Sequence, residues 1–295
     1  MATLFRRRDR GTTAERGTGR RFFWLGGRRH VADAPYVLPS DDQEINRLDF
    51  QHYMLRYALR GNYAAPLNHP ATILDVGSGT GRWAYEMAAL FPETRIVGTD
   101  LVAPKPDASG PLPPPNYTFA QGNVLEGLPF PDDSFDFVHM RLLLFAISAD
   151  KWPAVARELI RVTRPGGWVE SIETGPQQHG GPAMDTLVGW ITEASRRRGV
   201  DPLLGPHVAS FFANAGLTSM VTRAISLPVG RAGGRLGNMA AADVFGVVAG
   251  VKPLVAGLGI ADAQTYDSVL EAARADLDRH HCTLPFYIAY GQKPR

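Results

Sequence analysis

Residues 73–84 read ILDVGSGTGRWA, in which an apolar run is followed by three glycines within five residues. The apolar run predicts a short buried strand, and the residues after the glycines have the apolar spacing of a helix. Gly77, Gly79 and Gly81 lack a Cβ atom, so the backbone between the two elements can adopt positive φ and let a ligand approach closely. A helix that begins here presents unpaired backbone N–H groups. Ligands bind at the carboxyl ends of the strands in an open parallel sheet, so the stretch predicts a binding site.

The residues around the glycines indicate the ligand. A nicotinamide dinucleotide site requires a third glycine at the position of Arg82, and a P-loop requires a lysine that this stretch lacks. Asp75 instead places a carboxylate directly before the turn, where it would repel a diphosphate. A carboxylate suits a ligand that carries an ammonium and a sulfonium group, which favours S-adenosylmethionine. The carboxylate of this ligand could use the helix N–H groups, while Asp75 holds its ammonium end directly or through water.

Two further acceptors follow later strands of the pattern. Asp100 ends the second predicted strand, nineteen residues after Gly81, and can accept hydrogen bonds from both ribose hydroxyls. Asn123 follows the third strand and can offer its amide oxygen to the adenine amino group, with Val124 stacking or donating through its backbone. Each residue also has a structural alternative, since Asp100 could cap a helix and Asn123 could serve a turn.

The chain alternates between short apolar runs and amphipathic stretches. Strands are expected at residues 72–76, 95–99, 117–120, 135–139 and 168–172. Helical patterns lie between them, and this order predicts an α/β fold whose parallel sheet is covered on both faces. Residues 217–229 also have an extended pattern, and LPFYIAYGQKPR at the carboxyl terminus predicts a last strand.

The motifs resemble, in order, those of class I S-adenosylmethionine-dependent methyltransferases. ILDVGSGTGRWA, IVGTDL, GNVLEGLPFPDDSFDFVH and ELIRVTRPGGWVE resemble the successive motifs, and FYIAYGQK is similar to the antiparallel final strand. YVLPSDDQEINRLDFQHYML joined to this core resembles the LaeA-like group, methyltransferases known from secondary-metabolism regulation and biosynthesis. The resemblance is close over residues 36–174 and loose over 175–295. It implies a Rossmann-like, seven-stranded, mostly parallel sheet with an antiparallel last strand and helical cap insertions.

The remaining site residues are expected around the same strand ends. Ser78 lies within the glycine turn, Leu101 follows Asp100, and we assign both to donor binding together with Met140 and Arg141 after the fourth strand. Arg141 could orient the substrate or the methionine carboxylate of the donor.

A helix over Tyr36–Tyr57 could fold over the donor, with Tyr36, Gln51, His52 and Tyr53 reaching it. Methyl transfer requires alignment of donor and nucleophile, and a weakly acidic nucleophile also needs a base. His139 in the fourth strand and His179 in a glycine-flanked loop are the candidates for a catalytic base. His139 has the alternative role of a buried core histidine. The adjacent residues of HHC at 280–282 cannot converge on one ion, so no metal is expected.

Three parts of the chain are expected to differ in organisation. Residues 1–34 are predicted as a basic flexible tail, because residues 1–30 hold nine arginines against two acids, a net charge of +7. Residues 35–70 should form a helical cap, and 71–295 the donor-binding domain with insertions at about 175–215 and 238–280. The tail could engage nucleic acid or an anionic surface, or it could be a solvated arm.

The sequence therefore predicts an enzyme that transfers a methyl group from S-adenosylmethionine to a small, largely apolar, natural-product-like acceptor on oxygen, nitrogen or carbon. Two alternatives stay open: a donor-binding regulatory protein with little turnover, and a protein or RNA methyltransferase that docks through its Arg-rich tail. A single cysteine, Cys282, excludes an internal disulfide and fits a cytoplasmic location. No run of eighteen apolar residues is present, so no membrane span is expected.

Overall fold

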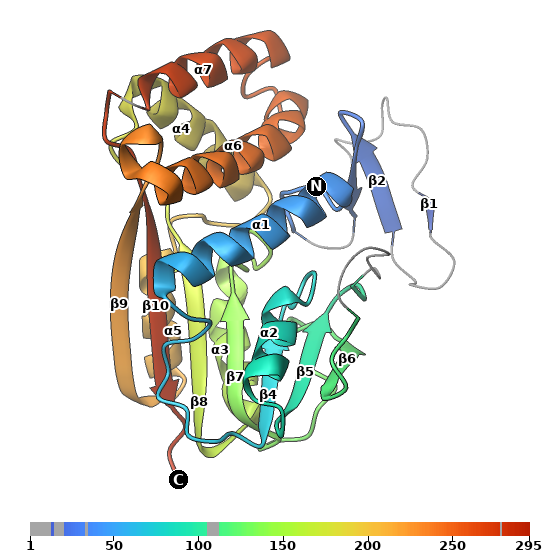
Figure 1. Ribbon diagram of the computed structural model, residues 1–295. Helices are drawn as coiled ribbons and strands as arrows, with labels where there is room; N and C mark the ends of the chain where they lie inside the picture. Colours follow the sequence, from blue (N-terminus) through green and yellow to red (C-terminus); the bar gives the residue numbers. More distant parts are fainter. Residues whose placement is uncertain (1–12, 15–20, 33–34, 105–111, 278) are drawn as a thin grey trace.

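The computed structural model describes residues 13–14, 21–32, 35–104, 112–277 and 279–295. Within them, the main sheet has seven strands in the order β6-β5-β4-β7-β8-β10-β9 (Figure 1). The strands are β4 (Thr72–Val76), β5 (Arg95–Asp100), β6 (Tyr117–Gln121), β7 (Phe135–Arg141), β8 (Thr163–Thr174), β9 (Thr218–Pro228) and β10 (Thr283–Gln292). Strands β4 to β8 pair in parallel, whereas β10 runs antiparallel to both β8 and β9. The predicted seven-stranded, mostly parallel sheet with an antiparallel last strand is confirmed.

Helices cover both faces of this sheet. All five residues of β4 are buried, as expected for a strand that is packed on both sides. Ile73, Ile96 and Phe137 pack in one cluster with residues of α2 (Arg82–Leu90). Side chains of the opposite face pack with α3 (Trp152–Val162) and α5 (Val208–Asn214).

The strand ends are roofed by helices from distant parts of the chain. The roof helices are α1 (Asp42–Leu59), α4 (Gly181–Arg197), α6 (Gly234–Gly257) and α7 (Ala263–Asp276). Helix α6 contacts α1, α4 and α7, and Figure 1 shows the last three helices of the roof grouped above α1. One difference from the expected cap concerns α5, which lies within the 175–215 insertion but contacts α3, β9 and β10. Its apolar residues therefore pack on the face of the sheet and not within the roof.

Helix α6 also bears on the expectation that no membrane span exists. In the described part of the chain, the segment Arg231–Gly257 is the one helical stretch long and apolar enough to cross a bilayer by length and composition. Half of its most apolar window is buried inside the protein, and Asp243 in the middle of the helix pairs with Arg47 of α1. The apolar composition is thus accounted for by the packing of a core helix.

The N-terminal segment is more ordered than the predicted flexible tail. Within residues 1–34, β2 (Arg21–Leu25) and β3 (Arg28–Val31) form an antiparallel hairpin, and β1 (Thr13–Ala14) pairs with β2. The turn of the hairpin lies against α6, because a Cβ atom on Gly26 would come within 2.8 Å of Pro253. Arg28 donates to Asp41, the N-cap residue of α1, over 2.7 Å from Nη2 to Oδ1. Residues 1–12, 15–20 and 33–34 of the predicted tail lie outside the described ranges.

Two buried carboxylates of β8 hold the loops that lead to the site. Glu170 accepts hydrogen bonds from the backbone N–H groups of Ala64 and Ala65, both over 2.7 Å. Glu173 accepts from Leu143 at 3.0 Å and Leu144 at 3.1 Å, in the loop after β7. Burial raises the pKa of Glu170 to about 7 and that of Glu173 to about 8, against the opposing effect of these hydrogen bonds.

The raised pKa of Glu173 predicts a pH-dependent stability. Between the ordinary carboxyl pKa and pH 8 the folded protein keeps a proton that the unfolded chain loses, so the free energy of unfolding falls as pH rises. One such group contributes a slope of about 1.4 kcal/mol per pH unit. Denaturant titrations from pH 5 to 8 should therefore show a smaller slope for Glu173→Gln than for the wild type.

The exposed Glu193→Gln variant is the control for this slope, and it should follow the wild type. Equal slopes for Glu173→Gln and the wild type would mean that Glu173 is ionised in the folded protein throughout this range.

Candidate active site

The glycine turn follows β4 and is built from backbone conformations that favour glycine. Gly77, Gly79 and Gly81 have φ values of 71°, 54° and 79°. A Cβ atom on Gly77 would lie 2.6 Å from the side chain of Leu143, so this position is also closed by packing. A Cβ atom on Gly79 would meet nothing within 4 Å. Gly79 therefore presents bare backbone to open space, and Gly81 is the N-cap residue of α2.

Asp100 ties the end of β5 to this turn. Its carboxylate accepts the N–H of Gly79 at 2.8 Å and the N–H of Leu101 at 2.6 Å. Burial raises the pKa of Asp100, and the backbone hydrogen bonds oppose that shift because they favour the charged form. The carboxylate is thus held by two neighbouring strand ends.

A cavity of about 320 Å³ lies over these strand ends. Its walls include ten of the residues expected from the sequence to bind the donor, namely Tyr36, Asp75, Gly77, Ser78, Gly79, Asp100, Leu101, Asn123, Val124 and Arg141. Arg29 and Val31 of the β2–β3 hairpin also line it, although the sequence pattern placed them in a flexible tail. We call this space the donor cavity.

Four of the expected site residues do not line the donor cavity. Gly81 is the N-cap residue of α2 and completes the glycine turn. Met140 is fully buried among the side chains that pack toward α3. His179 is exposed, with a φ of 57°, in the loop before α4. His139 is also fully buried and belongs to neither this cavity nor the second cavity described below.

His139 instead holds Asp75 in place. Its Nδ1 lies 3.0 Å from Oδ1 of Asp75, and its ring stacks on Trp83 at 3.8 Å between ring centroids. Burial lowers the pKa of His139, so the imidazole is neutral and donates its Nδ1–H to the carboxylate. The Nε2 atom has no hydrogen-bond partner among the described residues. This environment is that of the buried core histidine considered as the alternative.

Arg141 projects from the end of β7 into a polar chain that reaches α1. Its Nη2 lies 3.1 Å from Nδ1 of His52, and Nε2 of His52 lies 3.1 Å from Oε2 of Glu86. Burial and the charge of Arg141 lower the pKa of His52 to about 4. His52 is therefore neutral and accepts at Nδ1, which leaves the guanidinium charge facing the cavity.

Asn123 forms a turn at the far end of the donor cavity. Its Oδ1 accepts the N–H of Leu125 at 3.0 Å, and its Nδ2 donates to Glu126 at 2.8 Å. The side chain thus fills the structural role named as an alternative, and Asn123 and Val124 still line the cavity wall. An adenine contact would have to share the amide oxygen with Leu125 or use the backbone.

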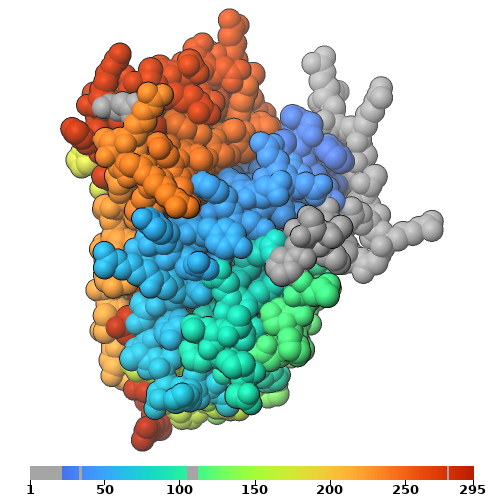
Figure 2. All heavy atoms as spheres, viewed as in Figure 1, coloured from blue at the N-terminus to red at the C-terminus, as the bar shows by residue number. Residues whose placement is uncertain are grey.

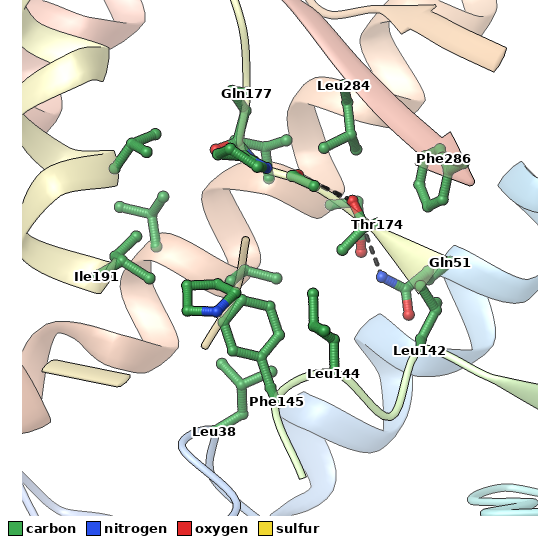
Figure 3. A pocket seen from close by; sticks show the side chains of 18 of the residues that line it. Leu38, Gln51, Leu142, Leu144, Phe145, Thr174, Gln177, Ile191, Leu284 and Phe286 are labelled. Atoms are coloured by element: carbon green, nitrogen blue, oxygen red, sulfur yellow. Dashed lines mark hydrogen bonds between the residues drawn. The ribbon is translucent and has the colours of Figure 1, made fainter. Parts of the chain in front are cut away.

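A second cavity, of about 80 Å³, lies between the sheet and the roof (Figure 3). Most of its lining is apolar, including Leu38, Leu144, Phe145, Ile191, Leu284 and Phe286, all labelled in the figure. Tyr36, Leu48, Gln51 and Leu142 line both cavities. These shared residues form the boundary between the two spaces, and we call the second one the roof cavity.

A buried ionic cluster adjoins this boundary and joins α1 to α6. Arg47 donates to both oxygens of Glu44, at 2.9 and 2.6 Å, and to Oδ1 of Asp243 at 2.6 Å. Gln51 donates from Nε2 to the other oxygen of Asp243 at 2.9 Å. Burial raises the pKa of both carboxyl groups, an effect that Arg47 opposes. No local sequence signal indicates a pair separated by 196 residues.

The open space and the positive φ of Gly79 predict a binding defect when a branched side chain is introduced there. In Gly79→Val, a branched side chain at positive φ would occupy the donor cavity, and the affinity for S-adenosylhomocysteine should fall at least tenfold in calorimetry. Gly259→Val is the matched control, because Gly259 also has positive φ, at 67°, faces open space and lines neither cavity. Equal affinity of Gly79→Val and the wild type would contradict the assignment of the turn.

The known proteins that this chain resembles are methyltransferases. The profile of a family described as "Methyltransferase domain" matches residues 73–167, which run from β4 into β8. The chain is 30% identical over 266 residues to methyltransferase str2 of Strobilurus tenacellus, covering 85% of this chain and 94% of that protein. It is 27% identical to N-methyltransferase gliN of Aspergillus fumigatus, covering 88% of this chain and 96% of that protein.

A third relative matches the core alone. The secondary metabolism regulator laeA of Aspergillus fumigatus is 35% identical over 141 residues, which cover 47% of this chain and 36% of that protein. These matches agree with the strand order and the glycine turn. The chain belongs to the class I S-adenosylmethionine-dependent methyltransferases and uses S-adenosylmethionine as its methyl donor.

Proposed function

We propose that this methyltransferase acts on a small, largely apolar, natural-product-like acceptor whose apolar part occupies the roof cavity. The observation that supports the proposal is the set of residues shared by the two cavities, because a molecule in the roof cavity would lie beside a donor bound in the donor cavity. A cavity lined mainly by leucine, isoleucine, valine and phenylalanine favours an apolar ring over a charged chain.

The charges of the donor cavity support the orientation of the donor. Its lining has four carboxylates and three guanidiniums, from Asp41, Glu44, Asp75 and Asp100 and from Arg29, Arg82 and Arg141. This formal charge of −1 complements a ligand with an ammonium, a sulfonium and one carboxylate. In our proposal Asp100 binds the ribose hydroxyls, Asp75 the ammonium group and Arg141 the carboxylate, with Asn123 and Val124 beside the adenine.

Alignment provides the main catalytic contribution in this account. Helix α1 closes over the donor in this proposal, since Gln51 and His52 of the helix and Tyr36 before it line the donor cavity. The helix is fixed to α2 by an ion pair between Arg82 and Asp49 at 2.9 Å. Neither histidine considered as a base lines either cavity, so we assign His139 to positioning Asp75 and give His179 no role in proton transfer.

The relatives support a small-molecule acceptor. Besides gliN, sirN of Leptosphaeria maculans is named an N-methyltransferase, and it is 29% identical over 97% of its length. One relative of the core region is named a protein-methionine methyltransferase and others are named regulators. The long matches to gliN and sirN include the region of the roof, which favours an acceptor of small size for this chain.

Labelled methyl transfer tests this function. Purified protein with radiolabelled S-adenosylmethionine and small-molecule extracts of the source organism should give an organic-soluble labelled product. Asp100→Ala should lower the yield at least tenfold, because it removes the proposed ribose contacts and the bond to Gly79. Asp150→Ala, in which the replaced side chain is exposed, is the control.

Label that appears only in added protein or RNA would overturn the small-molecule proposal. Deletion of residues 1–12 separates a docking tail from the catalytic unit, and turnover on small molecules should survive it. A longer deletion through residue 30 would remove Arg29 and most of the β2–β3 hairpin, so it would damage the donor cavity as well.

A further inference from the structure

The boundary between the two cavities contains one polar group whose orientation is fixed. The side chain of Gln51 is 9% exposed and lines both the donor cavity and the roof cavity. Its Nε2 donates to Oδ2 of Asp243 at 2.9 Å. A carboxylate accepts hydrogen bonds and cannot donate them when ionised, so the amide cannot be reversed in place. The Oε1 atom of Gln51 must therefore face away from Asp243.

This oxygen is left without a partner in the described protein. The bond to Asp243 is the one hydrogen bond that the side chain of Gln51 makes among the described residues, and it uses the nitrogen. The oxygen is not among the fully enclosed polar atoms that lack a partner, so it is open to the cavities and can accept a hydrogen bond from a bound molecule. Figure 3 shows Gln51 at the edge of the roof cavity, beside Leu142. An acceptor molecule that brings a hydrogen-bond donor to this point would satisfy it.

The carboxylates nearest to Gln51 already accept hydrogen bonds from protein side chains, which limits the groups that could act as a base on the acceptor. Both oxygens of Glu44 accept from Arg47, and the two oxygens of Asp243 accept from Arg47 and Gln51. An amide oxygen can accept a hydrogen bond and cannot take up a proton at neutral pH. A hydroxyl acceptor needs a base during transfer, whereas a neutral amine does not, since its lone pair is available.

We propose that Gln51, oriented by Asp243, recognises the acceptor through an N–H group, and that the acceptor is a neutral amine on an apolar ring system. This inference rests on the proposed function of the roof cavity. The nitrogen lone pair forms the C–N bond to the methyl carbon as the C–S bond breaks. The bonding pair returns to sulfur, which leaves as S-adenosylhomocysteine, and the N–H proton stays on the product ammonium until water removes it.

Three probes of nearly equal shape test the inference by binding. Indoline carries an N–H group, 2,3-dihydrobenzofuran carries an oxygen that can only accept, and indane carries neither. Ligand-observed NMR titrations are run on the full chain saturated with S-adenosylhomocysteine. The wild type should bind indoline at least tenfold more tightly than either of the other probes. In Gln51→Leu this preference should fall below threefold, because the amide oxygen is gone.

Gln177→Leu is the matched control, since Gln177 lines only the roof cavity and is also an amide. It should keep the preference of the wild type for indoline. A general loss of structure in Gln51→Leu would weaken all three probes alike, so the ratio separates recognition from folding. Equal binding of the three probes to the wild type, or a preference that persists in Gln51→Leu, would overturn the inference.

The two levels of the proposal fail in different ways. Equal binding of the three probes would overturn the recognition of an N–H group and leave the proposed function intact. A wild-type protein that binds S-adenosylhomocysteine but none of the probes would refute the role of the roof cavity, and with it the proposed function. A protein that does not bind S-adenosylhomocysteine at all would contradict the assignment of the donor cavity.

Discussion

The hydrogen bond from the N–H of Gly79 to the carboxylate of Asp100 joins the ends of two parallel strands, and the cavity proposed for the donor depends on it. It holds a positive-φ turn open at the point where no side chain fills the space. The same carboxylate also accepts from Leu101, so its orientation is determined before any ligand arrives. A preorganised acceptor of this kind lowers the ordering cost of binding. His139 has the same effect on Asp75 from beneath the turn.

Two helices of the roof, α1 and α6, are joined by a buried ion pair. Arg47 of α1 and Asp243 of α6 pair inside the protein, and breaking such a pair by removing one partner typically costs about 3–5 kcal/mol. Hydrophobic residues could hold the two helices together without this cost of desolvation. A polar cluster at the boundary of two cavities therefore favours a role in recognition, since it fixes Gln51 while the surrounding walls stay apolar.

Ten of the residues that the sequence assigns to the donor line one cavity, because their sequence signals are local. Gly79 and Asp100 stand at strand ends, and the topology of a parallel sheet brings such ends to one edge. His139 was harder to place, because strand periodicity does not reveal that Trp83 covers its ring. The docking of the β2–β3 hairpin was also missed, since its arginine-rich composition is typical of a solvated arm.

The packing of the roof helices could not be predicted from local sequence patterns. Arg47 and Asp243 are 196 positions apart, and neither helix contains a sequence motif that predicts their pairing. The position of α5 on the face of the sheet depends on its contacts with α3 and β10, whereas its sequence shows only an apolar helical pattern. Local patterns thus identify the elements, and long-range packing decides which cavity they enclose.

A crystal structure of the protein with S-adenosylhomocysteine tests the central claim most directly. The account predicts the ligand in the donor cavity, with both ribose hydroxyls on the carboxylate of Asp100 and the sulfur directed toward Gln51 and the roof cavity. A cavity that stays empty at saturating ligand, or a ligand whose ribose lies away from Asp100, would contradict it.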